Sequence, residues 1–340
     1  MSRGARVLDA DRQALPTEQG MSVSSLLVTT GSTNALFARV SYNSDRSIVP
    51  INDVVAQSID AHPPAFYCVH SASGVAGMDF LDLARGLEPD IRFYGIQAPP
   101  NQMSDSQFGR SVESIADYYA DALVDFQPTG PFLLGGYCVG GVIALALADN
   151  LRARGREVGP LLIIDGVPEN TGVSLRRWNP GYWLDLARNV RSWLNHADLM
   201  RNRTVDSLIW SISNNAMAIG KSAIGLKRGQ KFGGGYGIEG IMDVSRYPPT
   251  HKAFINRLFS ALFAYQPKSY SGEVVVYEAT VKPLLSSPQI GRIWRKFASQ
   301  SEVVGIVGTH ISMMHEPYVG ALSRDMRVRI AEFFAARSVR

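Results

Sequence analysis

The sequence predicts an α/β fold in which a doubly wound, mostly parallel sheet carries helices on both faces. Between Pro63 and Asp165, short apolar runs suited to buried strands alternate with stretches whose apolar residues repeat at helical spacing. The alternation returns after Tyr265, and this rhythm is typical of parallel sheets joined by crossover helices. At 340 residues, the chain suits one large domain of this kind with insertions, or two modest domains.

The strands are expected at apolar runs that lie between turn residues. These runs are Ala65–Val69, Arg92–Ile96, Phe132–Tyr137, Pro160–Asp165, Glu273–Tyr277 and Val303–Val307. Helices are expected where apolar residues recur at intervals of three and four. These stretches are 80–87, 112–126, 139 to about 154, and a closing helix that turns Leu322, Met326, Ile330 and Phe333 inward.

Composition limits the class of protein. A hydrophobic content of 46% and a charged content of 19% are typical of a soluble globular chain. Cys68 and Cys138 are the only cysteines, too few for a disulfide framework or a multi-cysteine metal site, so a reducing, cytoplasmic setting is expected. The polar N-terminus resembles no signal peptide, and no apolar run approaches the ~18 residues of a membrane span. The mild net charge of +4 comes without a nucleic-acid motif, so neither a membrane nor a nucleic acid is expected as a partner.

The domain organisation is inferred from changes in composition and periodicity along the chain. Residues 1–45 are polar and aperiodic and are expected to form an N-terminal arm, with the catalytic domain at 46–340. From about 168 to 265 the strand rhythm stops, which predicts a helical lid inserted in the domain. Residues 169–260 hold thirteen Lys or Arg against six Asp or Glu. Such a basic lid suits a phosphate-bearing or acidic partner, although a solvated helical surface explains the same charge.

The stretch Phe132–Ala144 has the pattern of a nucleophile elbow. An apolar strand runs into Gly136-x-Cys138-x-Gly140 and then directly into helical sequence. The nucleophile of an elbow sits in a strained turn whose close neighbours must be small, and both glycines meet that need. The helix that follows directs its N-terminus toward the reacting carbon, where its dipole favours negative charge. The alternative is a buried cysteine in a glycine-rich turn.

Further polar residues are expected at the same edge of the sheet. In parallel sheets, sites form beyond the carboxyl ends of the strands. Cys138, Asp165 and the small-residue loop His70–Gly74 all follow predicted strands directly, and Gly308-Thr309-His310 follows the last one. Their convergence favours the elbow over the buried cysteine.

The chain resembles the thioesterase domains that end non-ribosomal peptide synthetases and polyketide synthases, which have the α/β-hydrolase fold. The resemblance runs from about Ile48 to Phe334. It is carried by blocks in the same order as in the family: Phe66–Gly74, Phe93–Pro99, Gln127–Gly141, Leu151–Val158, Ile164–Asp165, Ala264–Gly272 and Gly308–His310.

By this resemblance Cys138 is the nucleophile, His310 the base and Asp165 the acid that orients it. This chain order of nucleophile, acid and histidine is the one that α/β-hydrolases use. The resemblance also assigns the oxyanion hole to the backbone N–H groups of Val139 and Ala72.

Each assignment has a rival in the sequence. His315 lies five residues after His310, but the Gly-x-His pattern after a strand favours His310. Glu278 follows the strand after which many α/β-hydrolases keep their acid, whereas Ile163-Ile164-Asp165-Gly166 matches the thioesterase pattern. His70 is expected to shape the oxyanion loop, as the family's histidine there does. Cys68 is expected to be a buried strand residue, and His62, His196 and His251 to be surface or packing residues.

The resemblance implies an enzyme that releases an acyl, peptidyl or polyketide chain from the 4'-phosphopantetheine of an acyl or peptidyl carrier protein, by hydrolysis or cyclisation, with no tightly bound cofactor. Cysteine in place of the usual serine departs from the family and favours transfer or ring closure, because the acyl-enzyme is itself a thioester. An acyltransferase that moves acyl or aminoacyl groups between carrier proteins is the main alternative. A polyhydroxyalkanoate synthase shares only the elbow motif, and an inactive scaffold would require an unreactive Cys138.

Overall fold

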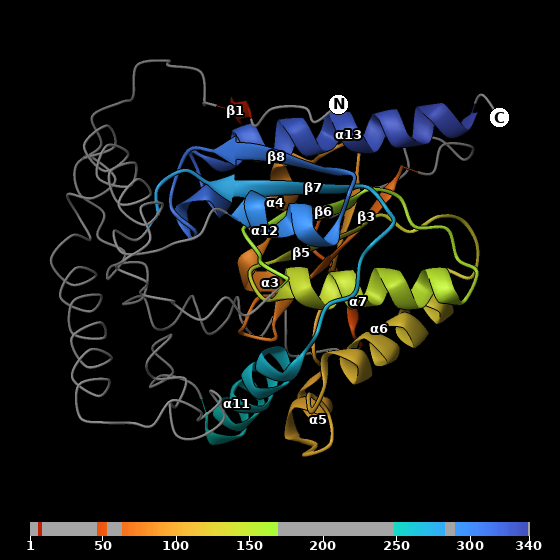
Figure 1. The fold of residues 1–340 in the computed structure, drawn as a ribbon, viewed down its shortest axis with the longest axis vertical. Coiled ribbons are helices and arrows are strands. Elements are labelled where there is room, and N and C mark those ends of the chain that lie inside the picture. Colours follow the sequence, from red (N-terminus) through yellow and green to blue (C-terminus); the bar gives the residue numbers. More distant parts are fainter. Residues whose placement is uncertain (1–5, 9–45, 53–62, 169–247, 283–289, 339–340) are drawn as a thin grey trace, which may run out of the picture.

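The computed structural model describes residues 6–8, 46–52, 63–168, 248–282 and 290–338, and these form one sheet with helices on both faces (Figure 1). The eight strands lie in the order β1-β8-β7-β6-β5-β3-β4-β2. Their bounds are β1 Arg6–Leu8, β2 Ile48–Pro50, β3 Ala65–Val69, β4 Arg92–Ile96, β5 Leu134–Tyr137, β6 Leu161–Ile164, β7 Val274–Ala279 and β8 Ser301–Ile306.

Parallel pairing runs through the sheet from β1 to β4, and β2 alone pairs antiparallel, at the β4 edge. The described helices are α3 Ala76–Asp79, α4 Leu81–Gly86, α5 Pro100–Ser104, α6 Val112–Phe126, α7 Gly140–Ala153, α11 Pro249–Ala264, α12 Ile290–Phe297 and α13 Val319–Ser338, with a 3-10 turn at Ser312–Met314. The predicted α/β-hydrolase class and doubly wound sheet are confirmed.

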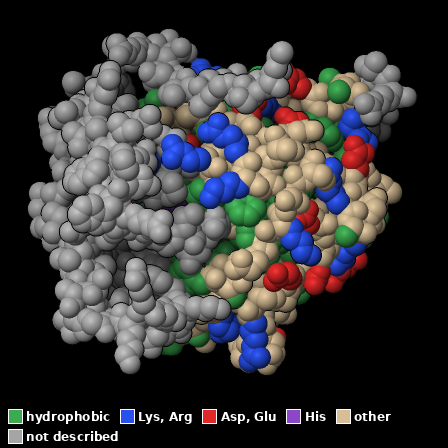
Figure 2. Space-filling view, viewed as in Figure 1, with side chains coloured by type: hydrophobic (Ala, Val, Ile, Leu, Met, Phe, Trp, Pro, Cys, Tyr) green, Lys and Arg blue, Asp and Glu red, His purple; other side chains and the backbone are tan. Residues whose placement is uncertain are grey.

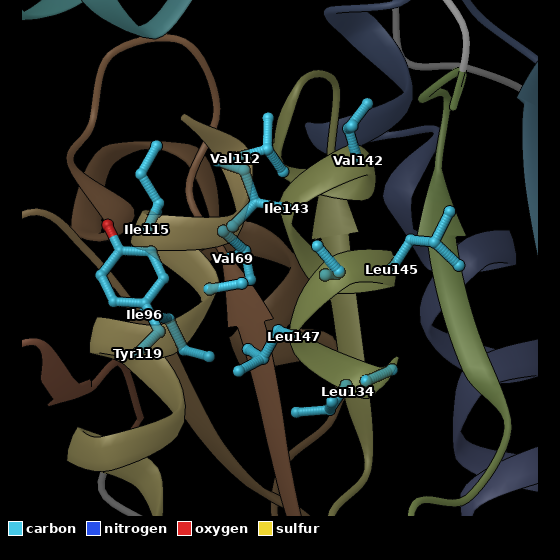
Figure 3. Close-up of a cluster of buried hydrophobic side chains, with 14 of the residues drawn as sticks. Val69, Ile96, Val112, Ile115, Tyr119, Leu134, Val142, Ile143, Leu145 and Leu147 are labelled. Atoms are coloured by element: carbon cyan, nitrogen blue, oxygen red, sulfur yellow. The ribbon is translucent and has the colours of Figure 1, made fainter. Parts of the chain in front are cut away.

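Two apolar cores lie on opposite faces of the sheet. The strands alternate between them, so that Tyr67 and Val69 of β3 point to the core under α6 and α7, whereas Phe66 and Cys68 point to the core under α4 and α13. Because both faces are covered, the strands are apolar at nearly every position. Figure 3 shows part of the first core, with these side chains labelled: Val69, Ile96, Val112, Ile115, Tyr119, Leu134, Val142, Ile143, Leu145 and Leu147.

Helix α6 illustrates how local sequence sets an element. Ser111 caps it by accepting a hydrogen bond from the backbone N–H of Ser114 at 3.1 Å. Its buried residues recur every three or four positions and face α7. The helix ends at Phe126, before Gln127-Pro128, because a proline disfavours the helical conformation of the residue before it.

The elbow between β5 and α7 depends on close backbone packing. Cys138 adopts a φ of 58°, in the left-handed region. A Cβ on Gly136 would lie 2.2 Å from the carbonyl oxygen of Gly140, and a Cβ on Gly140 would lie 2.3 Å from that of His70. The two glycines therefore permit the tight turn, and the second also lets the loop after β3 touch the start of α7.

Replacing Gly140 by alanine is expected to lower the free energy of unfolding by about 3 kcal/mol, since the clash is with backbone and not with a flexible side chain. Gly320→Ala is the matched control, because a Cβ there meets nothing within 4 Å. Urea unfolding of both variants checks this. Equal stabilities would contradict the packing argument.

Several elements were not predicted. Arg6–Leu8, inside the predicted polar arm, forms β1 and pairs with β8. Strand β2 and helices α5 and α12 were also missed. Residues 169–247, most of the predicted lid, lie outside the described residues. Within the predicted insertion, α11 is described, and it packs Phe254, Ile255 and Leu258 into the core.

The surface over α12 is basic. Its outer face exposes Arg292, Arg295 and Lys296, and Figure 2 shows Lys and Arg side chains gathered there.

In the described part of the chain, none of the helices combines the length and the apolar character needed to cross a bilayer.

Candidate active site

The predicted elbow places Cys138 at the carboxyl edge of the sheet. The Cys138 backbone N–H donates to Ile164 O at 2.9 Å, which ties the turn to the neighbouring strand β6. Cys138 is partly exposed, whereas Cys68 is fully buried in β3. Of the two cysteines, only Cys138 is therefore accessible from solvent.

His310 and Asp165 meet beside Cys138. The Asp165 Oδ2 accepts a hydrogen bond from His310 Nδ1 at 2.7 Å, and Asp165 Oδ1 accepts one from the Ala279 backbone N–H at 3.0 Å. Burial alone would raise the pKa of Asp165, but the His310 hydrogen bond and charge, with Lys282 and the Ala279 N–H, hold it below its usual value. Asp165 is thus a carboxylate aimed at the imidazole.

The imidazole of His310 lies between Asp165 and Cys138. Burial alone would lower the pKa of His310, but the charge of Cys138 and hydrogen bonds to Asp165 and to the Cys138 side chain raise it well above the usual value. Because Nδ1 donates to Asp165, Nε2 is left for the thiol. The structure therefore brings together the three side chains that the sequence singled out.

The rivals lie elsewhere. His315 Nδ1 is 2.9 Å from Asp82 Oδ2 at the surface. Glu278 Oε1 bonds Lys282 and accepts from the Ile290 backbone N–H at 3.1 Å, so it caps α12 instead of orienting His310. Neither competes for the His310–Asp165 contact.

The two candidate oxyanion donors lie on segments that touch. The loop after β3 contacts the start of α7, because His70 O and Val69 O pack against Gly140. Ala72 is in that loop, and Val139 is the N-cap residue of α7. Among described residues, neither backbone N–H donates a hydrogen bond to a protein group.

Two residues that sequence reasoning missed hold this loop. Asp79 Oδ2 accepts from the Ser71 backbone N–H at 3.3 Å and from Ser73 Oγ at 3.5 Å. His251, predicted to be a surface or packing residue, lies on α11 with its Nε2 bonded to Ser73 O. Asp79 lies only six to eight residues from its two partners, whereas His251 lies 178 residues from Ser73. Neither spacing is a helical or strand period, so the sequence carried no signal for either contact.

His70 holds the loop after β3 through contacts of its buried imidazole. It is fully buried, with Nε2 2.8 Å from the Tyr119 hydroxyl and Nδ1 2.5 Å from Ser71 O. Burial lowers the pKa of His70 from 6.5 to about 4, and the nearby His251 acts in the same direction, although the Ser71 contact opposes both. His70 is therefore a neutral structural residue, consistent with its predicted place in the oxyanion loop.

The lowered pKa of His70 predicts that the free energy of unfolding falls as the pH is lowered. Between pH 6.5 and about 4 the unfolded chain binds a proton at His70 that the folded chain does not bind, so stability falls as pH falls. The expected loss is about 3 kcal/mol over this window. His70→Gln should flatten the pH dependence of urea unfolding, whereas His315→Gln, at the surface, should not. A wild-type slope in His70→Gln would contradict the assignment.

The turn after β6 is fixed by a neighbouring helix. Trp294 of α12 is fully buried, and its Nε1 donates to Gly166 O at 2.8 Å, one residue after Asp165.

Within the described ranges, no three His, Cys, Asp or Glu side chains gather as a metal site would require.

The sheet, the elbow and this arrangement define an α/β-hydrolase fold of the thioesterase type. Residues 64–202 match the family model described as a thioesterase domain. Over 113 residues the chain is 36% identical to enterobactin synthase component F of Escherichia coli (strain K12). This alignment covers 33% of this chain and 8% of that protein. Malpibaldin synthetase of Mortierella alpina is 24% identical over 78% of this chain and 4% of its own length. The alignments thus span only a small part of these relatives.

Solved structures share the fold. The thioesterase domain of NocB from the nocardicin cluster aligns with a TM-score of 0.51 and 18% identity, over 84% of this chain and 99% of that one. A four-domain nonribosomal peptide synthetase, holo-AB3403, aligns with a TM-score of 0.53 and 19% identity, over 83% of this chain and 20% of that one. The comparisons show the predicted fold, and the match to the thioesterase-domain model is confined to residues 64–202.

Proposed function

We propose that this protein is a thioesterase that takes an acyl, peptidyl or polyketide group from the 4'-phosphopantetheine of a carrier protein and holds it on Cys138. The observation that carries the proposal is the position of the His310 imidazole, which is hydrogen-bonded to Asp165 on one side and interacts electrostatically with the Cys138 side chain. This is the arrangement that nucleophilic acyl transfer needs.

In the proposed reaction, His310 takes the proton of the Cys138 thiol, and Sγ attacks the thioester carbonyl. The N–H groups of Val139 and Ala72 stabilise the resulting oxyanion. When the intermediate collapses, the bond to the pantetheine sulfur breaks, and His310 returns the proton to that sulfur. Water, an internal hydroxyl or amine, or a second thiol then attacks the acyl-enzyme, again with His310 as the base.

The sulfur nucleophile favours transfer and ring closure over hydrolysis. Moving an acyl group from pantetheine to Cys138 exchanges one thioester for another, so little driving force is lost. The acyl-enzyme then stays more reactive toward amines and thiols than an oxoester would be. For this reason an acyltransferase that moves acyl or aminoacyl groups between carrier proteins is the second candidate function.

The test of the proposal is intact-mass analysis of the protein after incubation with a panel of acyl-pantetheine thioesters. The expected result is a single acyl adduct that peptide mapping places on Cys138. Adding a second phosphopantetheinylated carrier protein then separates the candidates, because transfer of the adduct to it supports the acyltransferase. Absence of any adduct across aliphatic, aminoacyl and peptidyl thioesters contradicts both.

Cys138→Ser is expected to change the product and not only the rate. Its acyl-enzyme would be an oxoester, so the ratio of free acid to cyclised or transferred product should rise severalfold relative to the wild type. Product analysis by mass spectrometry with the same carrier-bound acyl group measures this ratio. An unchanged ratio, with free acid alone from both proteins, would contradict the inference that the sulfur nucleophile favours transfer and ring closure over hydrolysis.

A further inference from the structure

Tyr137, the residue between the last glycine of β5 and Cys138, makes two separate contacts with His310. The two rings stack, with centroids 4.9 Å apart and planes 24° apart. The Tyr137 hydroxyl also donates a hydrogen bond to the His310 backbone carbonyl oxygen at 2.8 Å. The contacts bridge 173 positions of sequence, and Tyr137 is only 7% exposed.

The two partners of His310 restrain different motions. The hydrogen bond from Nδ1 to Asp165 lies near the ring plane and fixes rotation within it. A stacked ring instead blocks tilting out of the plane, and the hydroxyl bond holds the backbone that carries the imidazole. The His310 side chain is 39% exposed, so packing alone does not fix its orientation.

Tyr137 is also bonded covalently to Cys138, which adopts the left-handed conformation of the elbow. One residue therefore fixes the position of the sulfur and the position of the ring that must take its proton. We infer that Tyr137 is a positioning residue that holds His310 in register with Cys138 through ring stacking and its hydroxyl hydrogen bond. The inference rests on the proposed roles of Cys138 and His310.

The electrostatic setting supports this role. The groups that face the imidazole are Asp165 from the turn after β6, Cys138 from the elbow and Tyr137, while Lys282 acts on Asp165. A cation over the face of a tyrosine ring is stabilised by the ring's quadrupole. Tyr137 should therefore favour the imidazolium that forms when His310 takes the thiol proton.

Two substitutions separate the contacts. Tyr137→Phe keeps the ring and removes the hydroxyl bond, and it should lower kcat for acylation about fivefold with KM unchanged. Tyr137→Leu removes both contacts, should lower kcat further, and should lower the pKa of His310 by about half a unit. That pKa is followed by NMR of Cε1-labelled histidines, with the His310 signal assigned by its loss in His310→Ala.

Tyr67→Phe is the matched control. It removes a buried tyrosine hydroxyl bond of similar length, 2.7 Å to Gln127, on the strand next to β5. It should lower stability without changing kcat or the His310 titration. The inference is overturned if the Tyr137 variants acylate and titrate like the wild type, or if Tyr67→Phe slows acylation equally.

Cys138→Ala distinguishes a failure of this inference from a failure of the proposed function. If Cys138→Ala still turns over thioesters, the proposed function fails whatever Tyr137 does. If Cys138→Ala is inactive and the Tyr137 variants are unaffected, only the present inference fails. The NMR titration does not depend on turnover, and Tyr137→Phe keeps the test decisive if Tyr137→Leu does not fold.

Discussion

Replacing Cys138 by alanine is expected to remove the acyl adduct and to lower kcat for thioester turnover by about four orders of magnitude or more. Without Sγ no acyl-enzyme forms, and only binding and oxyanion stabilisation remain. The measurement is stopped-flow release of the pantetheine thiol together with intact-mass analysis of the protein.

Cys68→Ala is the control for this prediction, because it removes the only other thiol of the chain. Cys68 is fully buried in β3, so its loss should cost about 1 kcal/mol of stability and leave the adduct in place. An adduct that persists in Cys138→Ala and vanishes in Cys68→Ala would reverse the assignment.

Asp165→Asn is expected to lower kcat by about three to four orders of magnitude while the fold is kept. An amide holds the imidazole through a different hydrogen bond and no longer stabilises its protonated form. The pKa of His310 should fall, because the Asp165 hydrogen bond and charge are among the causes that raise it. The ascending limb of the pH–rate profile of kcat, where neutral His310 becomes available as the base, should therefore move to lower pH.

Glu278→Gln is the matched control, since Glu278 is the rival acid in the sequence. Its carboxylate is committed to Lys282 and to the Ile290 N–H, so kcat should change less than about threefold. Comparable losses in the two variants would mean that the acid is shared or misassigned. A large loss in Glu278→Gln alone would transfer the role to Glu278.

The local patterns predicted the main path of the chain. The elbow is recognisable because Gly136 and Gly140 flank Cys138 within five residues, and the helices and strands around it have clear periods. The closing helix was predicted from four inward positions, and the structure places it at Val319–Ser338. Strands β1 and β2 were missed because three residues carry no periodicity, and pairing with β8 and β4 alone makes them strands.

The supports of the site could not be predicted, for a related reason. The contacts of Trp294 with Gly166, His251 with Ser73 and Tyr137 with His310 join residues more than a hundred positions apart. Each residue looks like an ordinary core or surface side chain in its own segment. Only the folded sheet, which brings the carboxyl ends of β5, β6 and β8 to one edge, gives it a partner.

The left-handed backbone at the elbow has a consequence for how this protein could be stabilised. Asp165 shares it, with a φ of 46° beside the 58° of Cys138, and such conformations cost a residue with a Cβ about 1 kcal/mol. Glycine at either position would relieve that cost and remove the functional group together. Selection for thermal stability alone should therefore favour glycine at 138, so the stability optimum and the working sequence differ there. At 165 the loss of the hydrogen bonds to His310 and to the Ala279 N–H offsets the gain.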